Sequence, residues 1–169
     1  RPVDDAGHFH DDLPEVGGLF VKEADAVVVG GVDSICLSII YGFSSLQLTS
    51  ADPCIPFDVN RKGLSLGEAA GFALLKAGTD VNSSTLLGYG ESLDAHHMSS
   101  AHPEGLGAKL AMRAAAEKAG VGLTEIDYLN LHGTGTRAND DIENLACVDL
   151  LGERTRASST KSLTGHTLG

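Results

Sequence analysis

The chain has 169 residues, 42% of them apolar, which suits one compact domain with a sizeable core. Its formal net charge of −11 argues against nucleic acid and anionic membrane surfaces as partners, because all of these carry negative charge. No apolar run approaches the roughly 18 to 20 residues of a membrane-spanning helix, and residues 1–10 lack the basic-then-apolar order of an export signal. We therefore expect a cytoplasmic protein that binds neither nucleic acid nor membrane.

Residues 1–23 show no clear periodicity and predict an irregular leader. His8, His10 and Asp11 could bind a metal ion, but this segment holds no second cluster of ligands. A solvated polar tail is therefore the favoured interpretation. We expect no metal and no cofactor in the rest of the chain.

The first part of the remaining chain predicts a strand, a helix and a β-hairpin. Residues 24–31 contain three successive valines and end in two glycines, which is typical of a buried, parallel strand. Residues 38–48 predict a helix, and residues 50–66 predict a loop from their Pro, Asp, Asn and Gly content. Residues 70–76 and 85–91 predict neighbouring antiparallel strands, because turn-forming residues lie between them.

The second part alternates helices and strands. Residues 103–119 predict the clearest helix, which Gly120 stops. A strand is predicted over 124–131, a helix over 140–151 and a short strand over 156–160. Because strands and helices alternate, the chain is predicted to be α/β with parallel crossover connections.

Three cysteines, Cys36, Cys54 and Cys147, are widely spaced and form no CxxC motif. Their odd number and spacing argue against a zinc knuckle and a disulfide framework. We expect three reduced, structural thiols. Cys36 and Cys147 should be buried in apolar helical surroundings, whereas Cys54 should be more exposed in a loop.

A histidine stands where the strand predicted over 124–131 ends. His132 opens the sequence HGTGT, and ligands gather beyond the carboxyl ends of strands in open α/β sheets. An imidazole at this place can titrate or donate a hydrogen bond near neutral pH. A tight turn made by the two glycines, with Thr134 and Thr136 satisfying backbone groups, is the alternative. The phosphate-binding pattern GxxxxGK[ST] is absent.

Asp140 and Glu143 come shortly after His132 and open the helix predicted over 140–151. Asp140 can cap this helix, and we favour that role for it. Glu143 suits the positive end of the helix dipole, but it could instead fold inward and hold the His132 loop.

Lys161 and His166 belong to the sequence KSLTGH, on a turn predicted over 161–169. A cation beside an imidazole disfavours the protonated ring. Lys161 would therefore keep His166 neutral and able to donate one hydrogen bond to a developing oxyanion. Exposed positions on the surface are the alternative for both residues.

Taken together, these motifs resemble the β-ketoacyl synthase family, most closely its elongating condensing enzymes. HGTGT at 132–136 and KSLTGH at 161–166 are similar to the family's two histidine motifs, and residues 56–71 resemble its PFD…R.G…GEGAG stretch. The resemblance covers residues 24–169, where we expect one domain that is incomplete at both ends. It implies a thiolase-like layered fold with a mixed sheet flanked by helices, of which this chain would form from one half to two thirds.

The resemblance also implies a decarboxylative Claisen condensation of an acyl thioester with malonyl-acyl carrier protein, in fatty-acid or polyketide synthesis. His132 and His166 would be catalytic donors to the thioester oxygen, and Lys161 would orient and tune His166. The residues expected to support them are Glu143, Asp140, Thr134 and Thr136. The implied partners are acyl carrier protein thioesters, and no cofactor is implied.

The family's nucleophilic cysteine should lie shortly before the strand at 24–31, but residues 1–23 contain no cysteine. We therefore expect this chain to be part of a synthase and to catalyse no condensation alone. It should form a homo-oligomer or bind a complementary synthase segment, because half of such a fold exposes an apolar face. The alternative is a non-catalytic subunit that sets chain length or scaffolds a synthase heterodimer. An unrelated acidic binding module would make every motif match an accident.

Overall fold

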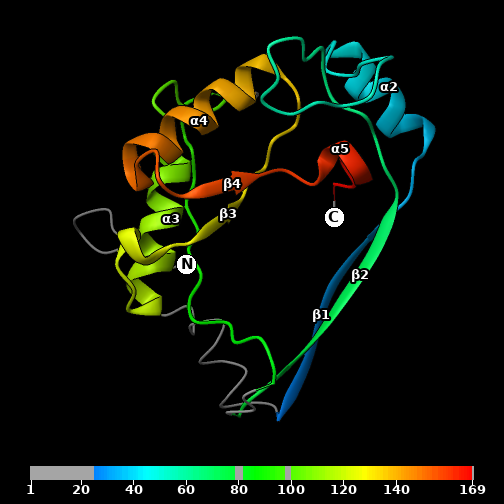
Figure 1. Ribbon diagram of the computed structural model, residues 1–169. Coiled ribbons are helices and arrows are strands. Elements are labelled where there is room, and N and C mark those ends of the chain that lie inside the picture. The colour runs from blue at the N-terminus through cyan, green and yellow to red at the C-terminus, as the bar shows by residue number, and fades with distance from the viewer. Residues whose placement is uncertain (1–24, 79–81, 98–99, 169) are drawn as a thin grey trace, which may run out of the picture. The chain divides into compact units, whose positions relative to one another are not determined.

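The computed structural model describes residues 25–78, 82–97 and 100–168 (Figure 1). The metal site considered at His8, His10 and Asp11 lies outside these residues. The chain forms two compact units: one holds Arg1–Gly31 with Gly71–Ser84, and the other holds Val32–Ala70 with Thr85–Gly169. The division between the units falls inside the stretch for which the sequence predicts one domain.

Strand β1 (Ala26–Asp33) pairs with strand β2 (Ala69–Lys76) in a two-stranded sheet. Both strands were predicted, but the predicted hairpin is wrong, because residues 85–91 form no strand in the described part of the chain. The β-branched residues of β1 suit a strand better than residues 85–91 do. A glycine in β1 also allows a close approach, since a side chain at Gly30 would lie 2.3 Å from the Gly71 carbonyl oxygen.

Burial in β1 also differs from the prediction. The strand alternates exposed and half-buried residues along its length, and Val28 is 66% exposed. Three successive valines indicated a strand that is covered on both faces, but the described structure does not bury them. Their apolar side chains therefore remain available for packing.

Helix α2 (Leu37–Ser45) confirms the helix predicted over 38–48. The loop predicted after it is also confirmed, with two isolated β-bridges at its end. Leu64 pairs with Thr49, and Leu66 pairs with His166 in a parallel bridge. The second bridge joins the loop to a segment far along the chain.

Helix α3 (Leu106–Ala119) begins three residues after the predicted start at Pro103 and packs against helix α4 (Arg137–Leu151). Gly105 precedes α3 in the left-handed backbone region, with φ 64°. A side chain there would lie 2.7 Å from Cβ of Ala146, a fully buried residue of α4. Glycine therefore allows both the turn and the close packing of the two helices. Gly120 ends α3 with φ 67°, as predicted.

Strands β3 (Tyr128–Asn130) and β4 (Arg156–Ser158) pair in parallel, with Tyr128 opposite Arg156 and Asn130 opposite Ser158. A 3-10 turn (Leu123–Glu125) precedes β3, and α4 connects the two strands. This confirms the α/β class and the predicted parallel crossover. The predicted turn at 161–169 contains a short helix, α5 (Lys161–Thr164), directly after β4 (Figure 1). Among the described residues, no helix is both long enough and apolar enough to cross a bilayer.

Candidate active site

The structure brings His132 and His166 together. His132 lies just after the end of β3. His166 lies just after α5, the short helix that follows the parallel partner strand β4. Their ring centroids lie 5.2 Å apart, and the rings meet nearly edge to face at 85°. Two imidazoles from distant parts of the chain therefore share one location. The ring of Phe43 also lies near His166, with 6.4 Å between the ring centroids.

Glu143 holds the backbone of the His132 loop from α4. Its Oε1 accepts a hydrogen bond from the His132 N–H at 2.6 Å, and its Oε2 accepts one from the Gly133 N–H at 2.8 Å. The inward orientation considered for Glu143 is therefore the one observed. Asn139 adds a weaker contact, donating to Oε2 at 3.4 Å. The imidazole of His132 is not needed for this anchoring and remains available.

Asp140 does not cap α4, so that prediction is wrong. The helix begins at Arg137, and Thr136 occupies the capping position. Asp140 is fully buried instead, and its carboxylate accepts hydrogen bonds from the Phe57 N–H at 2.8 Å and the Gly135 N–H at 3.2 Å. The local sequence shows a helix start, but it cannot show that the loop around residue 57 folds back onto the carboxylate.

Arg61 is a site residue that the sequence reasoning did not assign. Its Nε lies 3.4 Å from Asp140 Oδ2, its Nη1 donates to the Asp58 carbonyl at 2.8 Å, and its Nη2 pairs with Asp141. The guanidinium is buried and neutralises the buried Asp140. A buried carboxylate needs such a partner. Arg61 lies in the stretch 56–71 that resembles the family motif, and this was the feature of the sequence that could have identified it.

The two threonines of the HGTGT loop bond to each other, with 2.8 Å between the hydroxyl oxygens of Thr134 and Thr136. The Thr136 N–H also donates to Thr134 Oγ1 at 3.4 Å. These contacts support the turn itself, which is the alternative that the sequence left open for the threonines. Ser159 Oγ also contacts this loop and donates to the Gly133 carbonyl at 3.0 Å.

The backbone fixes the tautomer of His166. Its Nδ1 accepts a hydrogen bond from the Leu168 N–H at 3.2 Å, so a neutral ring carries its proton on Nε2. His166 is thus a hydrogen-bond donor through Nε2. Its backbone is held by Ser65, whose carbonyl accepts the His166 N–H at 2.7 Å.

Both imidazoles are biased toward the neutral form. Burial lowers the pKa of His132, and the Lys161 charge lowers it further against the opposing effect of Glu143 and Asp140. His132 keeps an exposed surface, but its ring lies partly covered beside His166. Burial also lowers the pKa of His166, followed by the charges of His132 and Lys161. Lys161 therefore acts electrostatically on both rings.

The three cysteines differ from the expected pattern of exposure. Cys54 is buried, and its Sγ donates to the Thr134 carbonyl at 3.2 Å, whereas Cys36 is exposed. Burial raises the pKa of Cys54, and it raises the pKa of Cys147 to about 11. A hydrogen bond from Ser38 lowers the pKa of Cys36. The reactive thiolate is thus disfavoured at Cys54 and Cys147.

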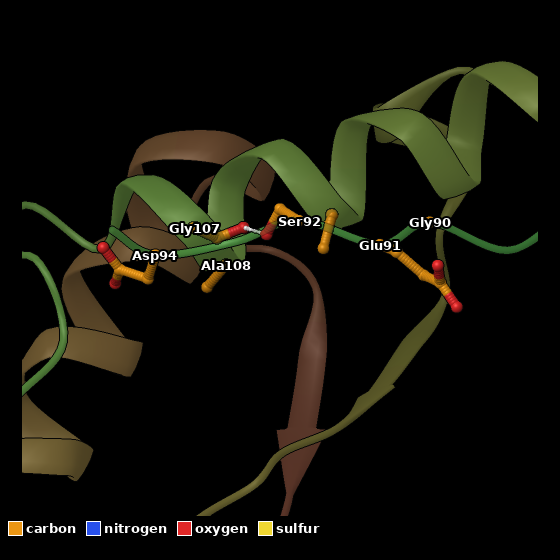
Figure 2. A pocket seen from close by; sticks show the side chains of 7 residues that line it. Gly90, Glu91, Ser92, Asp94, Gly107 and Ala108 are labelled. Atoms are coloured by element: carbon orange, nitrogen blue, oxygen red, sulfur yellow. Dashed lines mark hydrogen bonds between the residues drawn. The ribbon is translucent and has the colours of Figure 1, made fainter. Parts of the chain in front are cut away.

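A groove of about 590 Å³ lies apart from the histidines, between the extended segment 90–94 and the first turns of α3 (Figure 2). Two of its polar side chains have partners in the protein. Ser92 Oγ donates to the Gly107 carbonyl at 2.6 Å, and Asp94 Oδ2 accepts the His102 N–H at 2.7 Å. No group of side chains that could hold a metal ion occurs among residues 25–78, 82–97 and 100–168.

Comparison with known families identifies two matching domains. The family model of the β-ketoacyl synthase C-terminal domain matches residues 83–169, which is more than half of the chain. The model of the β-ketoacyl synthase N-terminal domain matches residues 17–80. The histidine pair belongs to the first of these matches.

Comparison with individual proteins points to the same family. The 3-oxoacyl-[acyl-carrier-protein] synthase 2 of Staphylococcus aureus is 36% identical over 163 residues, covering 87% of this chain and 40% of that protein. A solved ketosynthase in complex with its chain length factor from Xenorhabdus doucetiae superimposes with a TM-score of 0.81 at 45% identity, covering 89% of this chain and 38% of the other. The ishigamide ketosynthase/chain length factor gives a TM-score of 0.79 at 35% identity, covering 90% and 40%.

These likenesses confirm the thiolase-like fold that the resemblance implied. They also show that the chain spans about two fifths of the length of the relatives it matches.

Proposed function

The chain belongs to the β-ketoacyl synthase family, and from this we propose that it supplies the two imidazoles of a decarboxylative Claisen condensation. The substrates would be an acyl thioester and a malonyl thioester on acyl carrier protein. Loss of carbon dioxide from the malonyl group places negative charge on its thioester oxygen. His132 and His166 would donate hydrogen bonds to that oxygen.

The carrying observation is the contact between the two rings, 5.2 Å apart between centroids. A pair of N–H donors stabilises an oxyanion most effectively when both donors are aimed at one point and fixed in place before the reaction. The backbone bond to Nδ1 places the His166 proton on Nε2, and the lowered pKa of both rings favours their neutral forms. Removing one donor of this kind typically slows the reaction by about 10²–10³-fold.

Lys161 would tune the pair. Its charge lowers the pKa of both imidazoles, and its backbone N–H donates to Ser159 Oγ at 3.3 Å. Ser159 in turn bonds to the Gly133 carbonyl. Lys161 thus connects the two histidine loops and would act on both donors.

The thiol that accepts the acyl chain would come from outside these 169 residues. Cys54 and Cys147 have a raised pKa, which suppresses the nucleophilic thiolate. Cys36 is exposed at the start of α2, where its pKa is lowered by hydrogen bonds rather than by a basic partner. Among the described residues, none of the three thiols forms a hydrogen bond or ion pair with a basic side chain of the kind that activates a catalytic cysteine.

A second family segment is the proposed protein partner. The unit that holds the histidines exposes apolar side chains on several elements, among them Leu106 and Leu110 of α3, Tyr128 of β3, and Leu145 and Val148 of α4. A two-stranded parallel sheet such as β3–β4 is normally covered on both faces. A complementary synthase segment, or a second copy of this chain, would cover these surfaces.

The experiment measures carbon dioxide released from malonyl-acyl carrier protein labelled in the free carboxyl group. The chain should accelerate release without forming a β-ketoacyl product. His132→Ala and His166→Ala should each reduce the acceleration by about 10²-fold or more, whereas His96→Ala, outside the pair, should not. Release no faster than with carrier protein alone would reject the proposal. A β-ketoacyl product from the pure chain would show that the chain also supplies a nucleophile.

A non-catalytic subunit that sets chain length is the second candidate. It is favoured because structures that resemble this chain contain a ketosynthase paired with a chain length factor. In that case the chain would bind an active synthase and alter its product length, and His132→Ala with His166→Ala would leave this effect intact. The measurement is product length from the mixture of the two proteins.

A further inference from the structure

One loop contacts both histidine segments. The linking loop, residues 54–67, touches the His132 side through Cys54. The buried Sγ of Cys54 donates to the Thr134 carbonyl at 3.2 Å. The contact is tight, because a side chain at Gly135 would lie 2.8 Å from this sulfur. The position of the HGTGT loop therefore depends on the position of Cys54.

The other end of the linking loop contacts the His166 side through backbone alone. The His166 N–H donates to the Ser65 carbonyl at 2.7 Å, and the Gly67 N–H donates to the His166 carbonyl at 3.0 Å. A side chain at Gly67 would lie 2.1 Å from the Thr164 carbonyl oxygen. Gly67 is not in the left-handed backbone region, so glycine is needed here for space rather than for backbone conformation.

The two ends of the linking loop are also tied to each other. The Cys54 N–H donates to Ser65 Oγ at 3.1 Å. A continuous path of hydrogen bonds thus runs from the His166 backbone through Ser65 and Cys54 to Thr134. In the middle of the loop, the Phe57 N–H bonds to the buried carboxylate of Asp140. The loop is therefore fixed at its ends and at its centre.

We infer that the linking loop is a positioning element that sets the separation and tilt of the His132 and His166 rings, with Cys54 and Gly67 as its two points of contact. The effect of the linking loop on catalysis rests on the proposed function, because the two rings act as hydrogen-bond donors only in the proposed condensation. The geometry itself does not depend on that function. Neither Cys54 nor Gly67 touches the imidazoles, so each acts through the loop that carries a ring.

Gly67→Ala tests the His166 end, with Gly71→Ala as the matched control. Gly71 belongs to the same stretch of sequence, and a side chain there would meet no atom within 4 Å. The readout is the imidazole ¹H–¹³C NMR spectrum during a pH titration of the full chain, assigned with His132→Gln and His166→Gln. Gly67→Ala should shift the ring resonances of both histidines and raise the pKa of His166, because the displaced ring becomes less buried and moves away from His132 and Lys161. Gly71→Ala should leave both unchanged.

Cys54 tests the His132 end. Cys54→Ala removes the donor to the Thr134 carbonyl, whereas Cys54→Ser keeps a donor at the same position. Cys54→Ala should shift the His132 ring resonance, and Cys54→Ser should restore much of the wild-type position. This pair decides the question alone if circular dichroism shows that Gly67→Ala does not fold. Equal His132 spectra for wild type and Cys54→Ala would overturn the inference at this end.

Activity separates this inference from the proposed function. Under both, Gly67→Ala should lower the rate of malonyl decarboxylation by about 10²-fold, the usual effect of misplacing a reacting group by ~1 Å, with little change in KM. An inactive wild type with shifted ring resonances in Gly67→Ala would reject the proposed function and keep the positioning element. An active wild type whose resonances and rate are unaffected by Gly67→Ala would reject the positioning element and keep the function.

Discussion

Glu143 binds His132 through the backbone N–H of the histidine rather than through the imidazole. The two carboxylate oxygens accept the N–H groups of His132 and Gly133 at 2.6 and 2.8 Å, while the imidazole lies against His166. Anchoring therefore uses the backbone of His132, and the proposed donor role uses its imidazole. Glu143 thus holds the loop that carries the ring through two backbone N–H groups.

Glu143→Gln should lower the free energy of unfolding by about 2 kcal/mol, because hydrogen bonds to a charged acceptor contribute about 1.5–3 kcal/mol. The amide can accept only one of the two N–H groups, and its own NH₂ opposes the other. Urea denaturation measures the loss. Glu117→Gln, an exposed position on α3, is the control and should be neutral. Equal stability of the two variants would contradict the anchoring role of Glu143.

The two carboxylates beside Arg61 should contribute very unequally to stability. Asp140 is fully buried and Asp141 is 73% exposed, although both contact the same guanidinium. Asp140→Asn leaves a buried arginine short of a charged partner and should cost about 3–5 kcal/mol. Asp141→Asn removes an exposed partner and should cost less than about 1 kcal/mol. Thermal and urea unfolding of both variants would test this, and similar losses would contradict it.

Stability should fall in mild acid because of the histidine pair. Both imidazoles have a pKa below their ordinary value of 6.5 in the folded chain. Below about pH 6.5 the unfolded chain binds protons that the folded chain excludes, so folding is weakened as the pH drops toward the folded pKa values. Above that pH the contribution is fully present. His166→Gln should flatten this part of the curve of unfolding free energy against pH, and an unchanged curve would count against the effect.

Thiol labelling should distinguish the three cysteines. Cys36 is exposed and its pKa is lowered, so it should react first with a thiol reagent such as iodoacetamide. With a pKa of about 11 instead of 9.0, Cys147 carries about a hundredfold less thiolate at the same pH. Cys36→Ser should abolish the fast phase seen by mass spectrometry. A fast phase that survives in this variant would contradict the assignment.

The local sequence was sufficient for most elements of the fold. Helices α3 and α4 follow from apolar periodicity and from Gly120 as a stop, and β3 follows from the apolar residues Tyr128, Leu129 and Leu131. The motifs HGTGT and KSLTGH were enough to select His132 and His166 as candidates. These features depend on neighbours in the chain, which a sequence displays directly.

Partners across long stretches of chain were decided only by the tertiary structure. The turn residues after β2 suggested a hairpin, but β2 pairs with β1. Asp140 looked like a helix cap, but it is buried against Phe57 and Arg61. Cys54 looked like an exposed loop thiol, but it bonds to Thr134. In each case a distant segment folds back onto a residue whose local pattern allowed another role, and side-chain periodicity carries no information about which distant segment arrives.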